Sequence, residues 1–165
     1  MKTYSETAVK LLRENGMKIT TAESCTGGLI GKMITDVSGA SEVFECGIIS
    51  YSNDIKTSIL GVKPSTLEKF GAVSEETVIE MSGGALKISG ADISVAVSGI
   101  AGPTSDNTEK PVGLIWIAVN MRGKITTKKL NNSFDVNIRE NNRNSAANEA
   151  MKLLCDILAK SGGDT

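Results

Sequence analysis

Residues 17–37, MKITTAESCTGGLIGKMITDV, change their hydrophobic pattern within a few positions. The part that ends at Ser24 is rich in β-branched residues, which predicts a short strand. The apolar residues that follow recur at helical spacing, at Leu29, Ile30, Met33, Ile34 and Val37. A strand therefore leads into a helix through a loop of small residues, 24–28. Such strand–loop–helix units are the basis of α/β folds.

The rest of the chain continues this alternation of strands and helices. Helices are expected at 3–15, 64–71, 74–89 and 138–160, with Pro64 and Ser74 at helix starts, and a short helix or turn is expected at 53–62. Buried strands are expected at 43–51 and 91–99, and a hairpin at 112–130 that turns at Arg122–Gly123. This order predicts a three-layer α/β/α sandwich with a mixed, mainly parallel sheet.

The composition excludes several classes of protein. The chain has 165 residues, 40% of them hydrophobic, which suits one domain with its own core. Its 18 basic and 19 acidic residues leave no basic excess for a nucleic-acid surface. Cys25, Cys46 and Cys155 form no CxxC pair, which disfavours a disulfide framework or zinc site and favours a reducing cytoplasm. No apolar run approaches ~18 residues and the first helix is charged, so we expect neither a membrane span nor a signal peptide.

The chain contains no histidine, which restricts the chemistry of any active site. Ser-His-Asp and Cys-His catalysis are excluded, as are histidine-rich metal sites. A general base has to be Asp, Glu, Lys, Tyr or a thiolate.

The loop of small residues is expected to bind an anion or oxyanion. It matches neither a P-loop nor a dinucleotide fingerprint, because Thr26 stands where both need their first glycine. The unpaired N–H groups of about Thr26, Gly27 and Gly28, at the positive end of the helix dipole, point at whatever lies before them. Ser24 could attack a carbonyl while these groups hold the oxyanion. Plainer interpretations stay open: Ser24 as a helix cap, and Cys25 as a packing residue or an activated thiolate.

Ligands of α/β folds collect where strands end, and three loops leave strands there: 24–28, 51–56 and 99–104. We expect these loops to converge. The second loop carries Tyr51, Asp54 and Lys56, and a desolvated lysine can act as a base. Ser24, Tyr51 and Lys56 would then perform the function of a Ser-His-Asp triad, with a lysine amine in place of the imidazole. The alternative is that Lys56 is a surface lysine and Tyr51 merely ends a strand.

Four segments stand in a distinctive order: AESCTGG (22–28), GIISYSNDIKTSILGV (47–62), GAVSEETV (71–78) and VSGIAGPTSDNTEKPVGLIWIAV (97–119). Together they resemble the CinA carboxyl-terminal domain family, whose members include nicotinamide-mononucleotide amidohydrolases of the PncC type. The resemblance extends from Thr3 to about Leu158, and its four separate motifs make it specific.

The resemblance implies both a fold and a reaction. The family is similar to an α/β/α sandwich, and its enzymes hydrolyse the carboxamide of nicotinamide mononucleotide to nicotinate mononucleotide and ammonia, without metal or cofactor. The family's serine, tyrosine and lysine fall on Ser24, Tyr51 and Lys56. The expectation is therefore a single CinA C-terminal-like amidohydrolase domain over residues 1–165, in the cytoplasm.

The phosphate of such a substrate needs hydrogen-bond donors. The glycine-rich loop with Gly99, Ala101 and Gly102 suits close backbone approach to a ligand. Arg139 and Arg143, at the start of the last helix, are the best cationic partners. The plainer interpretations are an ordinary tight loop and a solvated helix face.

The chain departs from the family pattern at two places. Ser105 and Asp106 stand where glycines are common, and Asn137 and Ile138 replace Gly-Asp before Arg139. Two alternatives therefore stay open: a non-catalytic nucleotide-binding module of the same fold, or an amidase for another small carboxamide. The apolar faces of the first and last helices suggest a homo-oligomer, a dimer first.

Overall fold

One five-stranded sheet forms the centre of the molecule. In the computed structural model, which describes residues 2–105 and 108–161, its strands lie in the order β2-β1-β3-β4-β5. They are β1 (Ile19–Glu23), β2 (Phe44–Ile49), β3 (Ile93–Gly99), β4 (Leu114–Met121) and β5 (Lys124–Asn131). β1 is parallel to β2 and β3, and β4 is antiparallel to β3 and β5, so four of the five strands run in one direction. The mixed, mainly parallel sheet is confirmed. Asp106, in the altered loop, lies outside the described residues.

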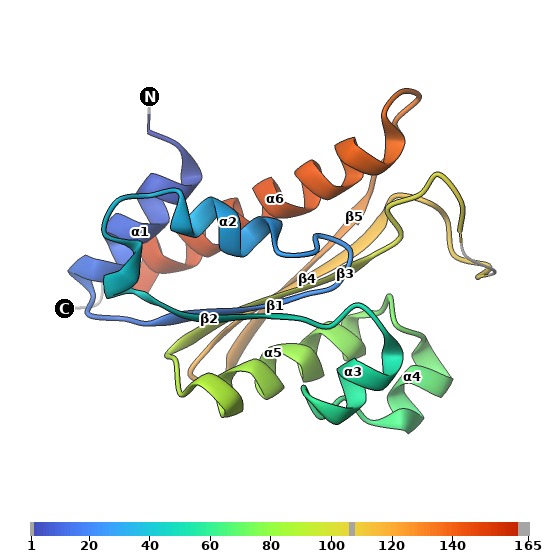
Figure 1. Ribbon diagram of the computed structural model, residues 1–165, viewed down its shortest axis with the longest axis horizontal. Helices are drawn as coiled ribbons and strands as arrows, with labels where there is room; N and C mark the ends of the chain where they lie inside the picture. The colour runs from blue at the N-terminus through green and yellow to red at the C-terminus, as the bar shows by residue number, and fades with distance from the viewer. Residues whose placement is uncertain (1, 106–107, 162–165) are drawn as a thin grey trace.

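Helices cover both faces of this sheet, which confirms the three layers (Figure 1). They are α1 (Tyr4–Glu14), α2 (Leu29–Thr35), α3 (Asn53–Ser58), α4 (Pro64–Phe70), α5 (Glu75–Ser89) and α6 (Ile138–Ser161), with a 3-10 turn, η1, at Ala40–Glu42. α1, α2 and α6 lie on one face, and α3, α4 and α5 on the other. No helix in the described part of the chain is both long and apolar enough to cross a bilayer.

The two faces of the sheet carry side chains of different size. The face under α1, α2 and α6 presents large aliphatic residues, among them Val95 and Ile117. On the other face, Ala22, Ala96 and Ala118 lie side by side in register across β1, β3 and β4. These alanines pack in one cluster with residues of α5. Their small side chains allow α5 to lie close to the sheet.

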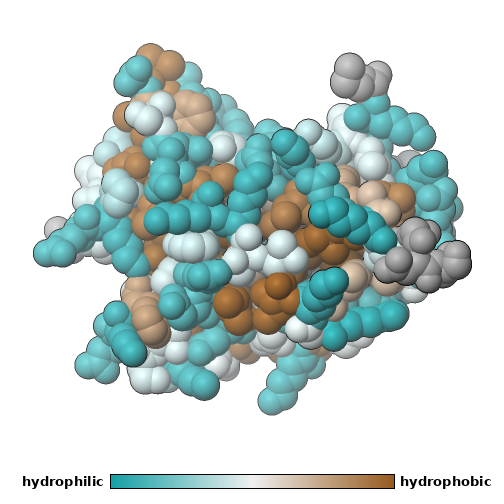
Figure 2. Space-filling view, turned by 180° about the vertical axis from the view of Figure 1, so that it is seen from behind, coloured by the Kyte–Doolittle hydropathy of each residue, from teal (hydrophilic) through white to brown (hydrophobic). Residues whose placement is uncertain are grey.

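β2 is an edge strand, and the prediction of a buried strand there is wrong. Its residues alternate between half-buried and exposed, with Glu45, Gly47 and Ile49 exposed. β1 is its one neighbour among the described strands, so its other edge has no strand beside it in the part of the chain that the structure describes. The opposite edge, β5, exposes Lys124 and Lys129, charges that discourage edge-to-edge pairing. Seen from behind, the surface is largely polar with small apolar patches (Figure 2).

Local signals locate several boundaries as expected. Ser74 Oγ accepts a hydrogen bond from the amide of Thr77 at the start of α5, and Pro64 is the first residue of α4. The hairpin turns at Arg122 and Gly123, whose φ angles are 52° and 93°. These left-handed values are those of a tight two-residue hairpin turn.

Gly84 in α5 is expected to tolerate no side chain, whereas its neighbour Gly83 is expected to tolerate one. A Cβ at Gly84 would lie 1.9 Å from the carbonyl oxygen of Leu60, while a Cβ at Gly83 would meet nothing within 4 Å. Gly84→Ala should lower the free energy of unfolding by about 1–3 kcal/mol through overpacking. Gly83→Ala should leave it unchanged or raise it by up to about 1 kcal/mol. Urea unfolding measures both, and equal effects of the two substitutions would contradict the close contact.

Candidate functional site

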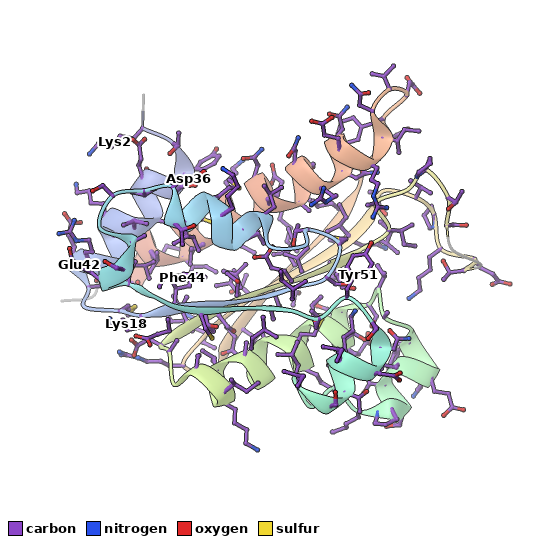
Figure 3. All side chains as sticks on the ribbon, in the orientation of Figure 1. Lys2, Lys18, Asp36, Glu42, Phe44 and Tyr51 are labelled. Carbon is purple, nitrogen blue, oxygen red and sulfur yellow. The ribbon has the colours of Figure 1, made fainter. Side chains whose placement is uncertain are left out.

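Three loops meet at the carboxyl ends of β1, β2 and β3, as predicted. Lys56 Nζ, in α3, lies 3.0 Å from Ser24 Oγ at the end of β1. Arg139, at the start of α6, donates to Tyr51 Oη at 2.8 Å and to the carbonyl oxygen of Gly102 at 2.9 Å. Figure 3 shows Tyr51 at this end of the sheet, between the two helix layers.

Ser24 and Lys56 form a buried pair. Lys56 is 1% exposed and Ser24 is 8% exposed. Lys56 Nζ also donates to the carbonyl oxygen of Ser50 at 2.8 Å, so the amine is held from two sides. Burial lowers the pKa of Lys56 from 10.5 to about 8, because removal from water disfavours the ammonium form. A neutral amine is therefore accessible at mildly alkaline pH, beside a hydroxyl that it can deprotonate.

Cys25, the other nucleophile in this loop, has a different environment. Its side chain is buried. Burial raises the pKa of its thiol to about 12, and the nearby charge of Glu23 acts in the same direction. Because the thiolate is the reactive form of cysteine, this environment suppresses its reactivity. The site favours Ser24 as the nucleophile and Cys25 as a packing residue.

The start of α2 is already occupied by an anion from the protein itself. The carboxylate of Glu23 accepts four hydrogen bonds there, from Thr26 Oγ1 (2.7 Å) and from the amides of Gly28 (3.0 Å), Ile30 (3.0 Å) and Gly31 (2.8 Å). The amide of Gly27 donates to the carbonyl oxygen of Ser24 at 3.1 Å. The prediction that Gly27 and Gly28 offer unpaired amides to an oxyanion is therefore wrong, because both amides have internal partners.

Ser24 is not the cap of this helix either. The N-cap of α2 is Gly28, with a φ of 100° and no side-chain hydrogen bond. Within residues 2–105 and 108–161, the amides of Cys25 and Thr26 form no hydrogen bond to another residue. Among these residues the Cys25 amide contacts only its own thiol, so both amides are candidates to hold an oxyanion, and Cys25 directly follows Ser24.

The glycines of the third loop have packing roles. A Cβ at Gly99 would lie 2.7 Å from Ile115 Cγ1 and 3.1 Å from Cys25 Sγ. Gly102 has a φ of 83°, and a Cβ there would lie 2.5 Å from Val112 Cγ1. Both positions therefore require glycine for the fold, and their contact with a substrate stays a prediction.

The first turns of α6 connect the loops. Arg143 donates to the carbonyl oxygens of Cys25 and Thr26, at 3.1 and 3.0 Å. Asn142 Nδ2 donates to the carbonyl oxygen of Ala101 at 3.0 Å. Arg143 is thus not a solvated surface residue, and its predicted contact with a substrate phosphate stays a prediction. Arg139 is exposed beside Tyr51, which is 61% exposed, so both side chains face the open mouth of the site.

Three groups that hold the site together were not identified from the sequence: the carboxylate of Glu23, the carbonyl oxygen of Ser50 and the side-chain amide of Asn142. Glu23 had a readable signal, since an acidic residue beside a helix start complements the helix dipole. The carbonyl of Ser50 had none, because every residue has one. Across the described ranges, no group of three or more Cys, Asp or Glu side chains is arranged to hold a metal ion.

The chain matches known sequences over almost its whole length. A model of the CinA C-terminal domain matches residues 1–158. A CinA-like protein of Kosmotoga olearia is 51% identical over 159 residues, which cover 96% of this chain and 37% of the relative. The chain thus spans about a third of the length of this curated relative. The nicotinamide-nucleotide amidohydrolase PncC of Escherichia coli is 48% identical over 126 residues, 76% of either chain.

Solved structures share the fold closely. A CinA superfamily protein of Klebsiella pneumoniae superposes with a TM-score of 0.90 at 35% identity, covering 95% of this chain and 96% of its own. A competence/damage inducible protein of Agrobacterium tumefaciens gives 0.88 at 38% identity, covering 96% and 97%. These similarities confirm the family resemblance found in the four motifs.

Native Cys25 is expected to react slowly with a thiol reagent. Its thiol is buried with a pKa of about 12, whereas Cys46 on β2 is half-buried at the sheet edge. At pH 8, a disulfide reagent such as Ellman's should label Cys46 before Cys25, and should label both after unfolding in urea. Peptide mass spectrometry over time assigns each label. If native Cys25 is labelled as fast as Cys46, the hypothesis of Cys25 as a thiolate nucleophile is again open.

Proposed function

This chain belongs to the CinA C-terminal domain family, and we propose that it hydrolyses the carboxamide of nicotinamide mononucleotide to nicotinate mononucleotide and ammonia. The observation that carries the proposal is the contact of 3.0 Å between Lys56 Nζ and Ser24 Oγ. It supplies a nucleophile and a base with no histidine. The name of the Escherichia coli relative supports this choice of substrate.

The reaction is that of a serine amidase with a lysine base. Neutral Lys56 takes the proton of Ser24 Oγ, and the oxygen attacks the carboxamide carbon. The amide of Cys25, next to the nucleophile, is the nearest candidate to hold the oxyanion. The Lys56 ammonium then gives its proton to the leaving nitrogen, which departs as ammonia. Water, deprotonated by Lys56, hydrolyses the acyl-enzyme ester and restores Ser24.

The contacts of Tyr51 support a role in substrate binding more than the predicted proton relay. Its hydroxyl accepts from Arg139 at the exposed rim, while Lys56 touches Ser24 directly. A relay through Tyr51 is therefore not required for proton transfer between the pair. We assign Tyr51 and Arg139 to contact with the substrate.

Ser24→Ala and Lys56→Met are expected to abolish ammonia release from nicotinamide mononucleotide. The first removes the nucleophile and the second removes the base at similar volume, and loss of general-base catalysis alone costs about 10²–10⁴-fold. An ammonia assay with circular dichroism of each variant makes the measurement, and Cys25→Ala is the control that should stay active. If the folded wild-type protein binds the mononucleotide in calorimetry but releases no ammonia, the protein is a nucleotide-binding module and not an amidase. If it releases ammonia only from another carboxamide, the proposed substrate is wrong.

The rate should increase with pH through the titration of Lys56. Only the neutral amine can accept the Ser24 proton, and the pKa of Lys56 is lowered to about 8. Well below that pH, kcat should rise about tenfold per pH unit, and it should level off above it. Lys56→Arg should be inactive at every pH, because a guanidinium stays protonated. A kcat independent of pH between 6 and 9 would exclude Lys56 as the base.

A further inference from the structure

Glu23 is the most completely bonded carboxylate near the site, and the reaction does not use it. Its side chain is 1% exposed, and it directly precedes Ser24. Its two oxygens accept hydrogen bonds from three backbone amides and from the hydroxyl of Thr26. Among the described residues Glu23 takes part in no ion pair, so these donors alone compensate its buried charge.

The alternation of β1 explains how Glu23 acts on its neighbour. Ala22 packs with the α5 cluster, so Glu23 points to the opposite face, where α2 begins, and Ser24 again points to the α3 side. Glu23 thus holds the loop from one layer while Lys56 reaches Ser24 from the other.

We propose that Glu23 is a positioning residue that holds the loop 24–28 in the conformation in which Ser24 Oγ meets Lys56 Nζ. The role given to Ser24 rests on the function proposed above. The carboxylate replaces a ligand anion at the start of α2, so anionic groups of the substrate bind elsewhere. A neutral glutamine cannot replace it, because it offers one acceptor oxygen to four donors and turns an NH₂ group against them.

The test compares variants that differ in this hydrogen bonding alone. Glu23→Gln keeps the shape and removes one acceptor, Thr26→Val removes one donor, and Thr26→Ser restores it. Glu45→Gln is the matched control, since Glu45 pairs with Lys18 at 3.4 Å on the exposed edge strand. Three quantities are measured: kcat and KM on nicotinamide mononucleotide, the labelling rate of Ser24 by a fluorophosphonate, and the pH titration of Lys56 by NMR. Urea unfolding reports the stability of each variant.

In Glu23→Gln we expect kcat and the labelling rate to fall together by at least about tenfold, with KM little changed, because a reacting group misplaced by about 1 Å can cost about 10²-fold. The Lys56 pKa should rise from about 8 as the displaced loop admits water. Thr26→Val should show a smaller loss that Thr26→Ser reverses, and Glu45→Gln should match the wild type.

Loss of stability in Glu23→Gln with wild-type labelling and wild-type Lys56 titration would overturn the proposal and leave Glu23 a purely structural residue. Ser24 labelling in a wild type that releases no ammonia would contradict the proposed substrate, and the labelling rates would still decide the role of Glu23. If Ser24 of the wild type is not labelled, its assignment as the nucleophile is contradicted. The titration of Lys56 alone then decides whether Glu23 positions the loop.

Discussion

The site depends on burying one lysine amine against one serine hydroxyl. Moving an ammonium group out of water is costly, and the fold offsets this only in part, with the carbonyl oxygen of Ser50 and the hydroxyl of Ser24. The remaining cost lowers the pKa of Lys56 and makes the neutral amine available. The reactivity that we propose for Lys56 thus rests on the incomplete compensation of its charge, and perturbed ionisation of this kind is common at functional sites.

The charged groups around this pair are largely committed to the protein itself. Glu23 fills the start of α2, and Arg143 binds the carbonyl oxygens of Cys25 and Thr26. Such internal bonding makes the loops rigid, because each contact fixes a peptide plane, and rigid loops keep reacting atoms in place. Arg139 differs, since it is exposed and has guanidinium donors to spare beyond its two bonds. Arg139 is therefore the cation that we propose for a substrate phosphate.

Sequence reasoning reached the layers and the convergence of the loops, because these follow from periodicity and strand direction. The absence of histidine made Lys56 a candidate base for Ser24, and the resemblance to the CinA family selected that pair. It failed where tertiary neighbours decide. β2 is as apolar as a central strand, yet it lies at the sheet edge, and no local pattern reveals strand order. Unpaired amides were expected at Thr26, Gly27 and Gly28 from helix geometry, but Gly28 donates to the side chain of Glu23 and Gly27 donates to the carbonyl oxygen of Ser24. The sequence thus correctly indicated that an anion binds at the start of α2, but not that this anion is the side chain of Glu23.

The reaction proposed for this pair would also depend on the spacing between the sheet and the helix layer that carries Lys56. Ser24 directly follows β1 of the sheet, and Lys56 lies in α3 in the helix layer on one face, so their separation is set by packing between layers. The segment after Lys56 takes part in this packing. The carbonyl oxygen of Lys56 accepts a hydrogen bond from the amide of Val62, and Leu60 lies against Gly84 of α5. Interiors are close-packed and transmit small displacements. A methyl group added at Gly84 would therefore push on the segment that carries the base, and so would act on the chemistry from outside the site.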